Sequence, residues 1–542
     1  MTRISYLRLT AAAVVCAAAI PALAADHPVT GEKLAETQTF SYRILDEIPT
    51  LDPQLNEDTS GSNALRDLFE GLMNQDAEGN LVPGVASGFE ATDGNRTYVF
   101  TLRPEAKWSN GDPVVAGDFV YAWQRAIDPA TASPYAWFVE MTTMKNAARI
   151  MAGELPPSDL GVTAVDDHTL KVELEQPIPY FAAMTTNTTF FPAHKATIEQ
   201  FGSEWTRPGN MVSNGAYMLA EHVPNEYHSR VKNPKYWDAG NVIIEKVTGF
   251  VINDENQALT RYLAGEVDKT DMPAGQFPEM KAKYPDEATS VPRLCNYYYS
   301  FNMTDSANPA LKDVRVRRAL SYAVDRDVIV NAVLKGGQSP AYGFVHTATA
   351  GFEAPDFPYA RMTQAERDAE AVKMLTEAGY GRGGQPLNLR LIYNTSESHK
   401  KIATVMAQMW KQKLGVEAEL INYEWKTYLD IRGNQDFDVA RNAWCGDYNE
   451  ASTFLSLMET DNDSNDGKYS NAEVDKLMTA SQTMADPGPA YAQIEAIVEQ
   501  DVPVVPVYFY ADAFMLKPDL KGWPYENVEQ NWYSKDFYRV AE

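Results

Sequence analysis

An alternation of strands and helices between residues 386 and 444 constrains the fold more than any other feature of this chain. Apolar segments at 386–393, 416–423 and 437–444 predict strands, and the segments between them, 397–414 and 425–433, predict helices. Strands joined by helical crossovers run parallel, so this βαβαβ series predicts a largely parallel sheet and an α/β fold. Sheets of this kind bind ligands outside the carboxyl ends of their strands.

The stretch FDVARNAWCGDYNE, residues 437–450, places opposite charges and an aromatic side chain at the end of the last of these strands. Because side chains alternate along a strand, Arg441 and Asp447 are expected on one face and Trp444 on the other. A short zwitterionic peptide beside this strand would find a cation for its carboxylate and an anion for its ammonium group. The alternative is that these side chains pair within a core. A ligand site is favoured because His399 follows another strand of the series and is expected at the same edge.

The first 24 residues have the pattern of a secretory signal peptide. Two arginines form a basic region, residues 9–20 form an apolar run too short to span a bilayer, and residues 22–24 resemble a cleavage site, so the mature chain should begin near Ala25. Cys16 lacks the leucine and small residue that usually precede a lipid-modified cysteine. We therefore expect a soluble exported protein and no lipoprotein, and no later run is long enough to predict a transmembrane helix.

Charge and length narrow the class of partner. Removing the leader with its two arginines changes the formal net charge from -27 to -29, which disfavours nucleic acid and anionic membrane surfaces as partners. The remaining 518 residues (542 minus 24), with 44% hydrophobic residues over the full chain, suffice for several cores at about 100 to 200 residues per domain.

Cys295 and Cys445 are the two cysteines that remain after removal of the leader. In an exported protein an even pair predicts one disulfide, with two buried free thiols as the alternative. A bond would close a loop of about 150 residues, which stabilises the fold by roughly 4 to 5 kcal/mol in the chain-entropy model. It would also join residues 292–302 to the stretch 437–450.

Elsewhere the pattern predicts separate strands and helices. Strands are expected at 39–44, 97–102 and 227–231, a hairpin at 163–174, a polar turn at 56–62, and helices at 63–73, 113–127, 192–201, 255–264, 313–334 and 491–500. Thr363 and Glu366 form a capping box that should begin a further helix. Prolines cluster between 177 and 192, which marks a candidate domain junction.

Motifs for cofactors and metals are weak. Gly379, Gly381 and Gly384 match GxGxxG, but they follow a helix and precede a strand, the reverse of the order that phosphate binding requires. The sequence has no P-loop, GxSxG or HExxH motif, and its seven histidines lack metal-ligand spacing. We predict no cofactor and no metal. A hydrolase that uses a pair of carboxylates stays open as the enzyme hypothesis.

Ordered stretches along nearly the whole mature chain resemble the periplasmic oligopeptide-binding proteins of ABC importers, the family 5 extracellular solute-binding proteins. The matching stretches are LDPQLNEDTSGSNALRDLFEGL, KWSNGDPVVAGDFVYAWQRAIDPATASPYA, DLGVTAVDDHTL, LCNYYYSFN, DVRVRRAL, PLNLRLIYNTSESHKK, EWKTYLDIR and FDVARNAWCGDYNE.

The resemblance implies an α/β fold of the type II periplasmic-binding-protein class, with two main lobes around a cleft and an extra third domain. The implied units are a signal peptide at 1–24, a discontinuous lobe I at 25–69, 195–294 and 512–542, an extra domain II at 70–194, and lobe III at 295–511. A hinge would let two lobes close around the ligand.

The resemblance also implies a function and a set of binding residues. The protein is expected to be a monomeric, non-catalytic periplasmic receptor that captures short oligopeptides and delivers them to a membrane-embedded ABC permease. Asp447 would receive the α-ammonium group, Arg441 and His399 would meet C-terminal carboxylates directly or through water, and Cys295 would bond Cys445. The other implied cleft residues are Glu57, Tyr135, Trp425, Arg432, Trp444 and Tyr510, with the backbone near Cys445 pairing with the peptide.

The chain departs from the family pattern at two places, and the first of them leaves the preferred peptide length open. Leu334 stands where close relatives have a lysine for the carboxylate of the shortest peptides, with Lys335 one position later, and Gly433 replaces a histidine that follows the cleft arginine. A receptor for cell-wall (murein) peptides is the alternative within the binding class, and a secreted carboxylate-dependent hydrolase is the alternative outside it.

Overall fold

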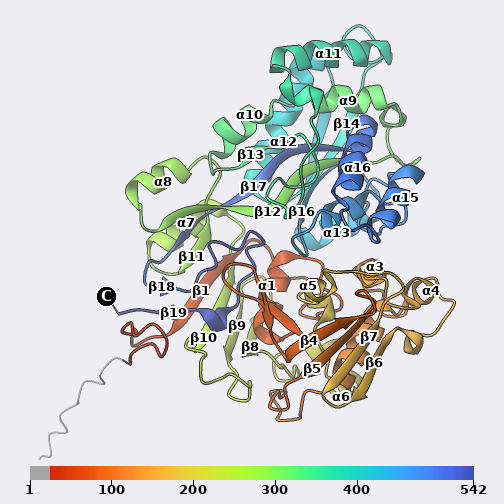
Figure 1. Ribbon diagram of the computed structural model, residues 1–542. Helices are drawn as coiled ribbons and strands as arrows, with labels where there is room; N and C mark the ends of the chain where they lie inside the picture. The colour runs from red at the N-terminus through yellow and green to blue at the C-terminus, as the bar shows by residue number, and fades with distance from the viewer. Residues whose placement is uncertain (1–24, 542) are drawn as a thin grey trace, which may run out of the picture.

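The computed structural model describes residues 25–541 (Figure 1), so the predicted signal peptide and its cleavage site lie outside the described residues. Eleven strands form one mixed sheet in the order β15-β14-β16-β12-β17-β11-β1-β10-β9-β8, with β13 paired to β17. Within 25–541 the structure contains no helix with the length and apolar character needed to cross a bilayer.

One end of the large sheet is built from segments far apart in the sequence. Its strands are β1 (Thr39–Ile44), β8 (Tyr217–Val223), β9 (Tyr227–Lys232), β10 (Lys246–Val251) and β11 (Lys269–Asp271), and its helices are α1 (Thr59–Leu68), α7 (Glu255–Leu263) and α8 (Phe277–Lys283). β1 runs parallel to β10, whereas β10, β9 and β8 pair antiparallel. The last segments of the chain return to this end as β18 (Leu520–Lys521) and β19 (Tyr538–Arg539), as Figure 1 shows.

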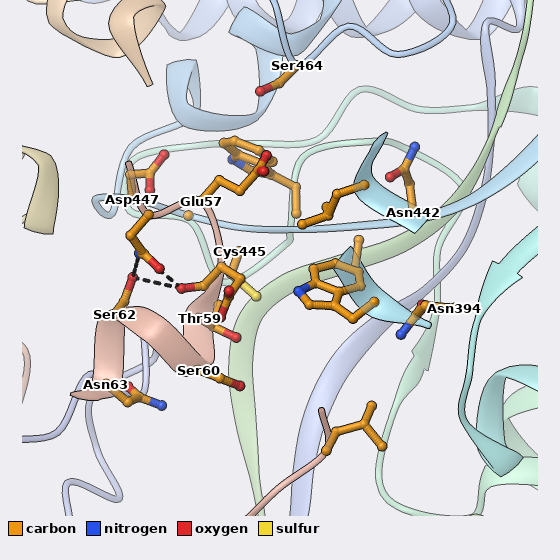
Figure 2. A pocket seen from close by; sticks show the side chains of 18 of the residues that line it. Glu57, Thr59, Ser60, Ser62, Asn63, Asn394, Asn442, Cys445, Asp447 and Ser464 are labelled. Carbon is orange, nitrogen blue, oxygen red and sulfur yellow. Dashed lines mark hydrogen bonds between the residues drawn. The ribbon is translucent and has the colours of Figure 1, made fainter. Parts of the chain in front are cut away.

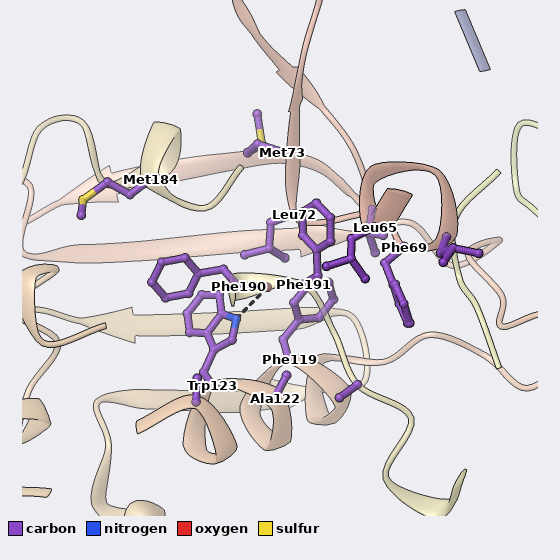
Figure 3. Packing of buried hydrophobic residues seen from close by; sticks show 14 of the residues in the cluster. Leu65, Phe69, Leu72, Met73, Phe119, Ala122, Trp123, Met184, Phe190 and Phe191 are labelled. Atoms are coloured by element: carbon purple, nitrogen blue, oxygen red, sulfur yellow. Dashed lines mark hydrogen bonds between the residues drawn. The ribbon is translucent and has the colours of Figure 1, made fainter. Parts of the chain in front are cut away.

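A separate antiparallel sheet, in the order β4-β5-β7-β6, lies beside this end. The elements of this part are β2 (Met73–Gln75), β3 (Leu81–Pro83), β4 (Ala86–Thr92), β5 (Thr97–Leu102), β6 (Val162–Asp166), β7 (Thr169–Glu173), α2 (Ala116–Ile127), α3 (Ala136–Met141), α4 (Ala147–Met151), α5 (Phe181–Met184) and α6 (Lys195–Phe201). Figure 3 shows the core in which Leu65 of α1 and Phe69, which follows that helix, meet Phe119 of α2. The indole Nε1 of Trp123 donates to the carbonyl of Phe190 at 2.8 Å, which satisfies a polar group inside this core.

The other end of the large sheet contains the predicted βαβαβ series. Its elements are β13 (Ser339–Pro340), β14 (Asn388–Asn394), β15 (Glu417–Tyr423), β16 (Val439–Cys445), α9 (Val314–Tyr322), α10 (Arg326–Val328), α11 (Gln364–Glu377), α12 (Glu397–Met409), α13 (Trp425–Gly433), α14 (Ser452–Leu455), α15 (Ala472–Ser481) and α16 (Gly488–Asp501). β14 runs parallel to both β15 and β16, as the crossovers predict.

Two long strands, β12 (Ala288–Phe301) and β17 (Val504–Leu516), connect the two ends of the sheet. β17 pairs with β11 near its carboxyl end, and β12 pairs with β16 from Cys295 onward. The register between β12 and β17 shifts between Pro292 and Asn296. Regular pairing is therefore interrupted where the chain passes from one end of the sheet to the other.

Several predicted elements differ from the structure for identifiable reasons. The helix expected at 313–334 is broken, because the side chain of Asp325 accepts from the backbone N–H of Val328 and begins α10 as a new helix, followed by a π-helical turn at Ile329–Leu334. α1 begins at Thr59, inside the turn predicted at 56–62, because Asp58 caps it. The sheet is parallel within β15-β14-β16 and within β11-β1-β10, whereas β12 pairs antiparallel with both β16 and β17. The domain boundaries implied by the resemblance stay a prediction.

Candidate functional site

A cavity of about 280 Å³ lies between the two ends of the large sheet and the separate antiparallel sheet. All of the binding residues expected from the sequence line it: Glu57, Tyr135, His399, Trp425, Arg432, Arg441, Trp444, Cys445, Asp447 and Tyr510. In Figure 2, Asp447 and Asn394 lie at opposite sides of the cavity, with β16 between them.

Strand β16 offers part of its edge to this cavity. β14 pairs with β16 only at Val439 and Ala440, so the following residues have no strand partner on that side. The N–H of Trp444 donates to the Asn296 side chain on the β12 side at 3.1 Å, so the backbone groups of Ala443 and Cys445 point to the unpaired side. An extended ligand could add there as a further strand.

Asp447 follows the end of β16 and presents an incompletely satisfied carboxylate. Its Oδ1 accepts from Asn187 Nδ2 at 2.8 Å and from the Tyr135 hydroxyl at 3.5 Å, whereas Oδ2 is buried without a partner. Among the ion pairs of residues 25–541, none includes Asp447. Burial, and next the carboxylate of Glu529, raise the pKa of Asp447 to about 7. A bound cation would satisfy both the free oxygen and the charge.

Arg441 presents the complementary case. Its Nη2 donates to the Tyr510 hydroxyl at 2.9 Å and its Nη1 to Asn394 Oδ1 at 3.3 Å, while Nε is buried without a partner. The guanidinium lies 4.7 Å from the ring centroid of Tyr297, and no carboxylate of the described residues pairs with it. An arginine is always protonated, so this is a buried cation available to an anion.

His399 lies next to this cation, with its Nδ1 3.4 Å from the hydroxyl of Tyr297. Burial lowers the pKa of His399 well below its usual value, and the charge of Arg441 lowers it further. The imidazole is therefore neutral at pH 7. It can contribute a hydrogen bond to a ligand carboxylate, but no charge.

A polar pocket lies along the cavity between these charges. Arg432 pairs with Asp466 at 3.2 Å and donates to Asn442 at 2.6 Å. Glu57 forms no hydrogen bond or ion pair within the described chain, and burial raises its pKa, partly opposed by Arg432. Trp444 stacks on Tyr135 with the ring planes 10° apart, and its indole Nε1 is buried without a partner.

Leu334 and Lys335 do not contribute to the cavity. Leu334 is buried in a hydrophobic core, and Lys335 is exposed in a left-handed conformation at the end of the π-helical turn. A different cation, Arg293, lines the cavity and pairs with Asp512 at 3.2 Å. Neither Leu334 nor Lys335 therefore supplies a cation to this cavity.

Sequence reasoning missed several polar residues of the cavity: Arg66, Asn187, Arg293, Asp466 and Glu529. They come from loops, from helix α1 and from strand β12, which only tertiary packing brings together, and no local motif marks them. The Cys295–Cys445 disulfide is present and joins β12 to β16 beside the cavity.

A model of the bacterial extracellular solute-binding proteins, family 5 (middle), matches residues 80–466. The chain belongs to this family. A similar family 5 protein is the periplasmic murein peptide-binding protein MppA of Escherichia coli K12, 44% identical over 521 residues, which cover 95% of this chain and 96% of MppA. The periplasmic oligopeptide-binding protein OppA of the same organism is 42% identical over 547 residues, which cover both chains completely.

Solved structures of family 5 proteins resemble this one closely. The E. coli murein tripeptide-binding protein MppA matches with a TM-score of 0.91 at 44% identity, covering 94% of this chain and 100% of MppA. Haemophilus influenzae OppA in complex with the peptide RPPGFSPFR matches with a TM-score of 0.90 at 37% identity, with the same coverage. An unliganded open form of MppA matches with a TM-score of only 0.68 at 43% identity, covering 95% of this chain and 99% of that one.

Proposed function

We propose that this protein is a periplasmic receptor of an ABC importer, which captures short oligopeptides and delivers them to a membrane permease. The observation that carries the proposal is the pair of unmatched buried charges, Asp447 and Arg441, at the two ends of the unpaired edge of β16. A peptide has the complementary charges at its two ends and an extended backbone between them. The names of MppA and OppA, and the peptide bound to the Haemophilus protein, support the same class of ligand.

In this proposal each part of the cleft binds one part of the peptide. The α-ammonium group of the peptide donates to Oδ2 of Asp447, and the peptide backbone pairs with the backbone of Ala443 and Cys445. The terminal carboxylate binds Arg441, with His399 as a neutral hydrogen-bonding group. Side chains extend into pockets lined by Glu57, Trp425, Arg432, Trp444, Tyr135 and Tyr510.

Capture requires the cleft to open and close. We assign lobe I to 25–69, 195–294 and 512–542, domain II to 70–194 and lobe III to 295–511, with the hinge in β12 and β17. The TM-score of 0.91 to one MppA structure against 0.68 to its unliganded open form indicates that the present conformation is closed. Closure brings Asn187 of domain II onto Asp447 of lobe III, so the ligand, domain II and lobe III meet at one carboxylate.

Two other functions are weighed against this one. A receptor for murein peptides is favoured by the 44% identity to MppA, and competition between murein tripeptide and ordinary tripeptides for the purified protein distinguishes it. For a carboxylate-dependent hydrolase, incubation with peptides or glycans would release products. We propose that the protein is non-catalytic, because the described charges of the cleft are arranged to bind the ends of a ligand.

Calorimetric titration of the ligand-stripped mature protein tests the proposal. Trialanine has both charged ends. N-acetyl-trialanine has only the carboxylate, and trialanine amide has only the ammonium group. We expect trialanine to bind, acetylation to abolish the contact with Asp447, and amidation to weaken the contact with Arg441. If none of the three binds, and murein tripeptide does not bind either, the proposed ligand class is wrong.

A further inference from the structure

The ammonium end of the cleft contains a second buried carboxylate that the proposed function does not use. Glu529 lies in the loop between β18 and β19, lines the same cavity as Asp447 and is 8% exposed. Its Oε2 accepts from Gln75 Nε2 and from Asn531 Nδ2, both at 2.9 Å. Its Oε1 takes part in none of the hydrogen bonds of residues 25–541, so one oxygen stays available to a ligand.

No cation contacts either carboxylate at this end. Asp447 and Glu529 are absent from the ion pairs of the described chain, which extend to 4.0 Å. The guanidinium of Arg66, which also lines the cavity, donates instead to Asn63 Oδ1 at 3.3 Å, and its Nε is buried without a partner. A single ammonium group on Asp447 would therefore leave Glu529 without a contacting cation.

The charge of the whole cavity allows a second cation. Its lining includes seven carboxylates and four arginines, and Arg432 and Arg293 are already engaged in ion pairs. The negative charge of Glu529 also acts on Asp447, since it is the largest Coulombic contribution that raises the pKa of Asp447. Two buried carboxylates that raise each other's pKa by repulsion are stabilised by a ligand that brings more than one positive charge.

We propose that Glu529 recognises a basic side chain on the first residue of the peptide. This inference rests on the proposed function and deepens it. With the α-ammonium group on Asp447, the side chain of the first residue begins one carbon away, and a lysine or arginine would reach toward Oε1 of Glu529. The ligand class is then short peptides with a basic amino-terminal residue. The protein would recognise the position of the basic residue in the peptide as well as the net charge.

Positional isomers separate this contact from a general attraction of cations. Lys-Ala-Ala, Ala-Lys-Ala and Ala-Ala-Lys have the same composition and net charge, and trialanine is the neutral reference. We expect the wild-type protein to bind Lys-Ala-Ala about tenfold more tightly than trialanine, as a close buried charge pair can provide. Glu529→Gln should remove that preference, because glutamine can still accept from Gln75 and Asn531 but has no charge.

The other peptides and a second variant serve as controls. Glu529→Gln should bind Ala-Lys-Ala and Ala-Ala-Lys with affinities within about twofold of the wild-type values. Its affinity for trialanine should be unchanged or higher, because the negative charge that repels the carboxylate of Asp447 is removed. Asp436→Asn, which neutralises an exposed carboxylate outside the cleft, should leave the preference for Lys-Ala-Ala over trialanine intact. Thermal unfolding of each variant establishes that the fold is retained.

Two results would overturn the inference while peptide binding itself stands. One is equal affinity of the wild-type protein for Lys-Ala-Ala and trialanine. The other is an equal loss for all four peptides in Glu529→Gln, which would make Glu529 a structural acceptor for Gln75 and Asn531. If no peptide binds to the wild-type protein, the proposed function and this inference both fail.

Discussion

At the scale of single residues, the cleft is defined by atoms that the protein itself leaves unsatisfied. Oδ2 of Asp447 lacks a donor, and Nε of Arg441 and the indole Nε1 of Trp444 lack acceptors, although all three atoms are buried. Buried polar atoms without partners are rare in folded proteins because each costs free energy. The acceptor on Asp447 and the donor on Arg441 fit the ammonium group and the carboxylate of a peptide, and the indole of Trp444 lies between them.

Asp447→Ala is expected to weaken peptide binding by about 2 to 5 kcal/mol, because removal of one partner of a buried charge pair leaves the other charge uncompensated. Calorimetric titration with trialanine measures the loss. The matched control is Asp436→Ala, which removes an exposed aspartate that pairs with Arg390 outside the cleft and should leave affinity unchanged. An unchanged affinity in a correctly folded Asp447→Ala protein would contradict the assignment.

How far the sequence could predict the site depended on the kind of signal. Strand alternation and the position of the strand ends drew attention to Arg441, Trp444 and Asp447, which belong to one segment. The positions of Glu57 and Tyr135 followed from the family resemblance. Glu529 could not be found in either way, because its place in the cleft depends on the loop that returns from β18, and that packing leaves no local pattern.

At the scale of elements, β12 and β16 are joined by a ladder of backbone pairs and by the disulfide at its end. We expect the Cys295→Ala/Cys445→Ala protein to fold but to lose up to about 4 to 5 kcal/mol of unfolding free energy, since the bond closes a loop of 150 residues. Denaturant unfolding followed by tryptophan fluorescence, with and without a reductant, measures this. Reductant should destabilise the wild-type protein and leave the double variant unaffected; equal stability of the two proteins would contradict the prediction.

The elements that sequence patterns predicted best are those determined by local signals. The capping box of Thr363 and Glu366 begins α11, and the period-two strand at 39–44 is β1 with the same bounds. The break between α9 and α10 was missed because residues 313–334 contain no proline, and Asp325 acts as a cap only when its neighbours turn away from the helix. Antiparallel pairing of β12 and β17 depends on contacts between strands more than 200 residues apart, which periodicity does not report.

At the scale of the whole molecule, the proposed closed conformation buries two carboxylates, Asp447 and Glu529, that no cation of residues 25–541 contacts. Burial raises the pKa of Asp447 and of Glu529 to about 7 in this closed conformation. In an open cleft both would face water and have values near the ordinary 4. Between about pH 4 and pH 7 the ligand-free protein therefore takes up protons when it closes. At neutral pH the ionised carboxylates oppose closure in the absence of a ligand.

The sign of this linkage gives a prediction for the ligand-free protein. Because the pKa values are higher in the closed form, lowering the pH from 7.5 to 5.5 should favour closure, by up to about tenfold per pH unit for each proton taken up. Small-angle X-ray scattering should then show a smaller radius of gyration at pH 5.5. The Asp447→Asn/Glu529→Gln protein, which has neither carboxylate, should have the same radius at both pH values, and the peptide complex should stay closed at both because the bound ammonium group keeps Asp447 ionised. A ligand-free wild-type radius that is constant or increases on acidification would show that these two groups do not control closure.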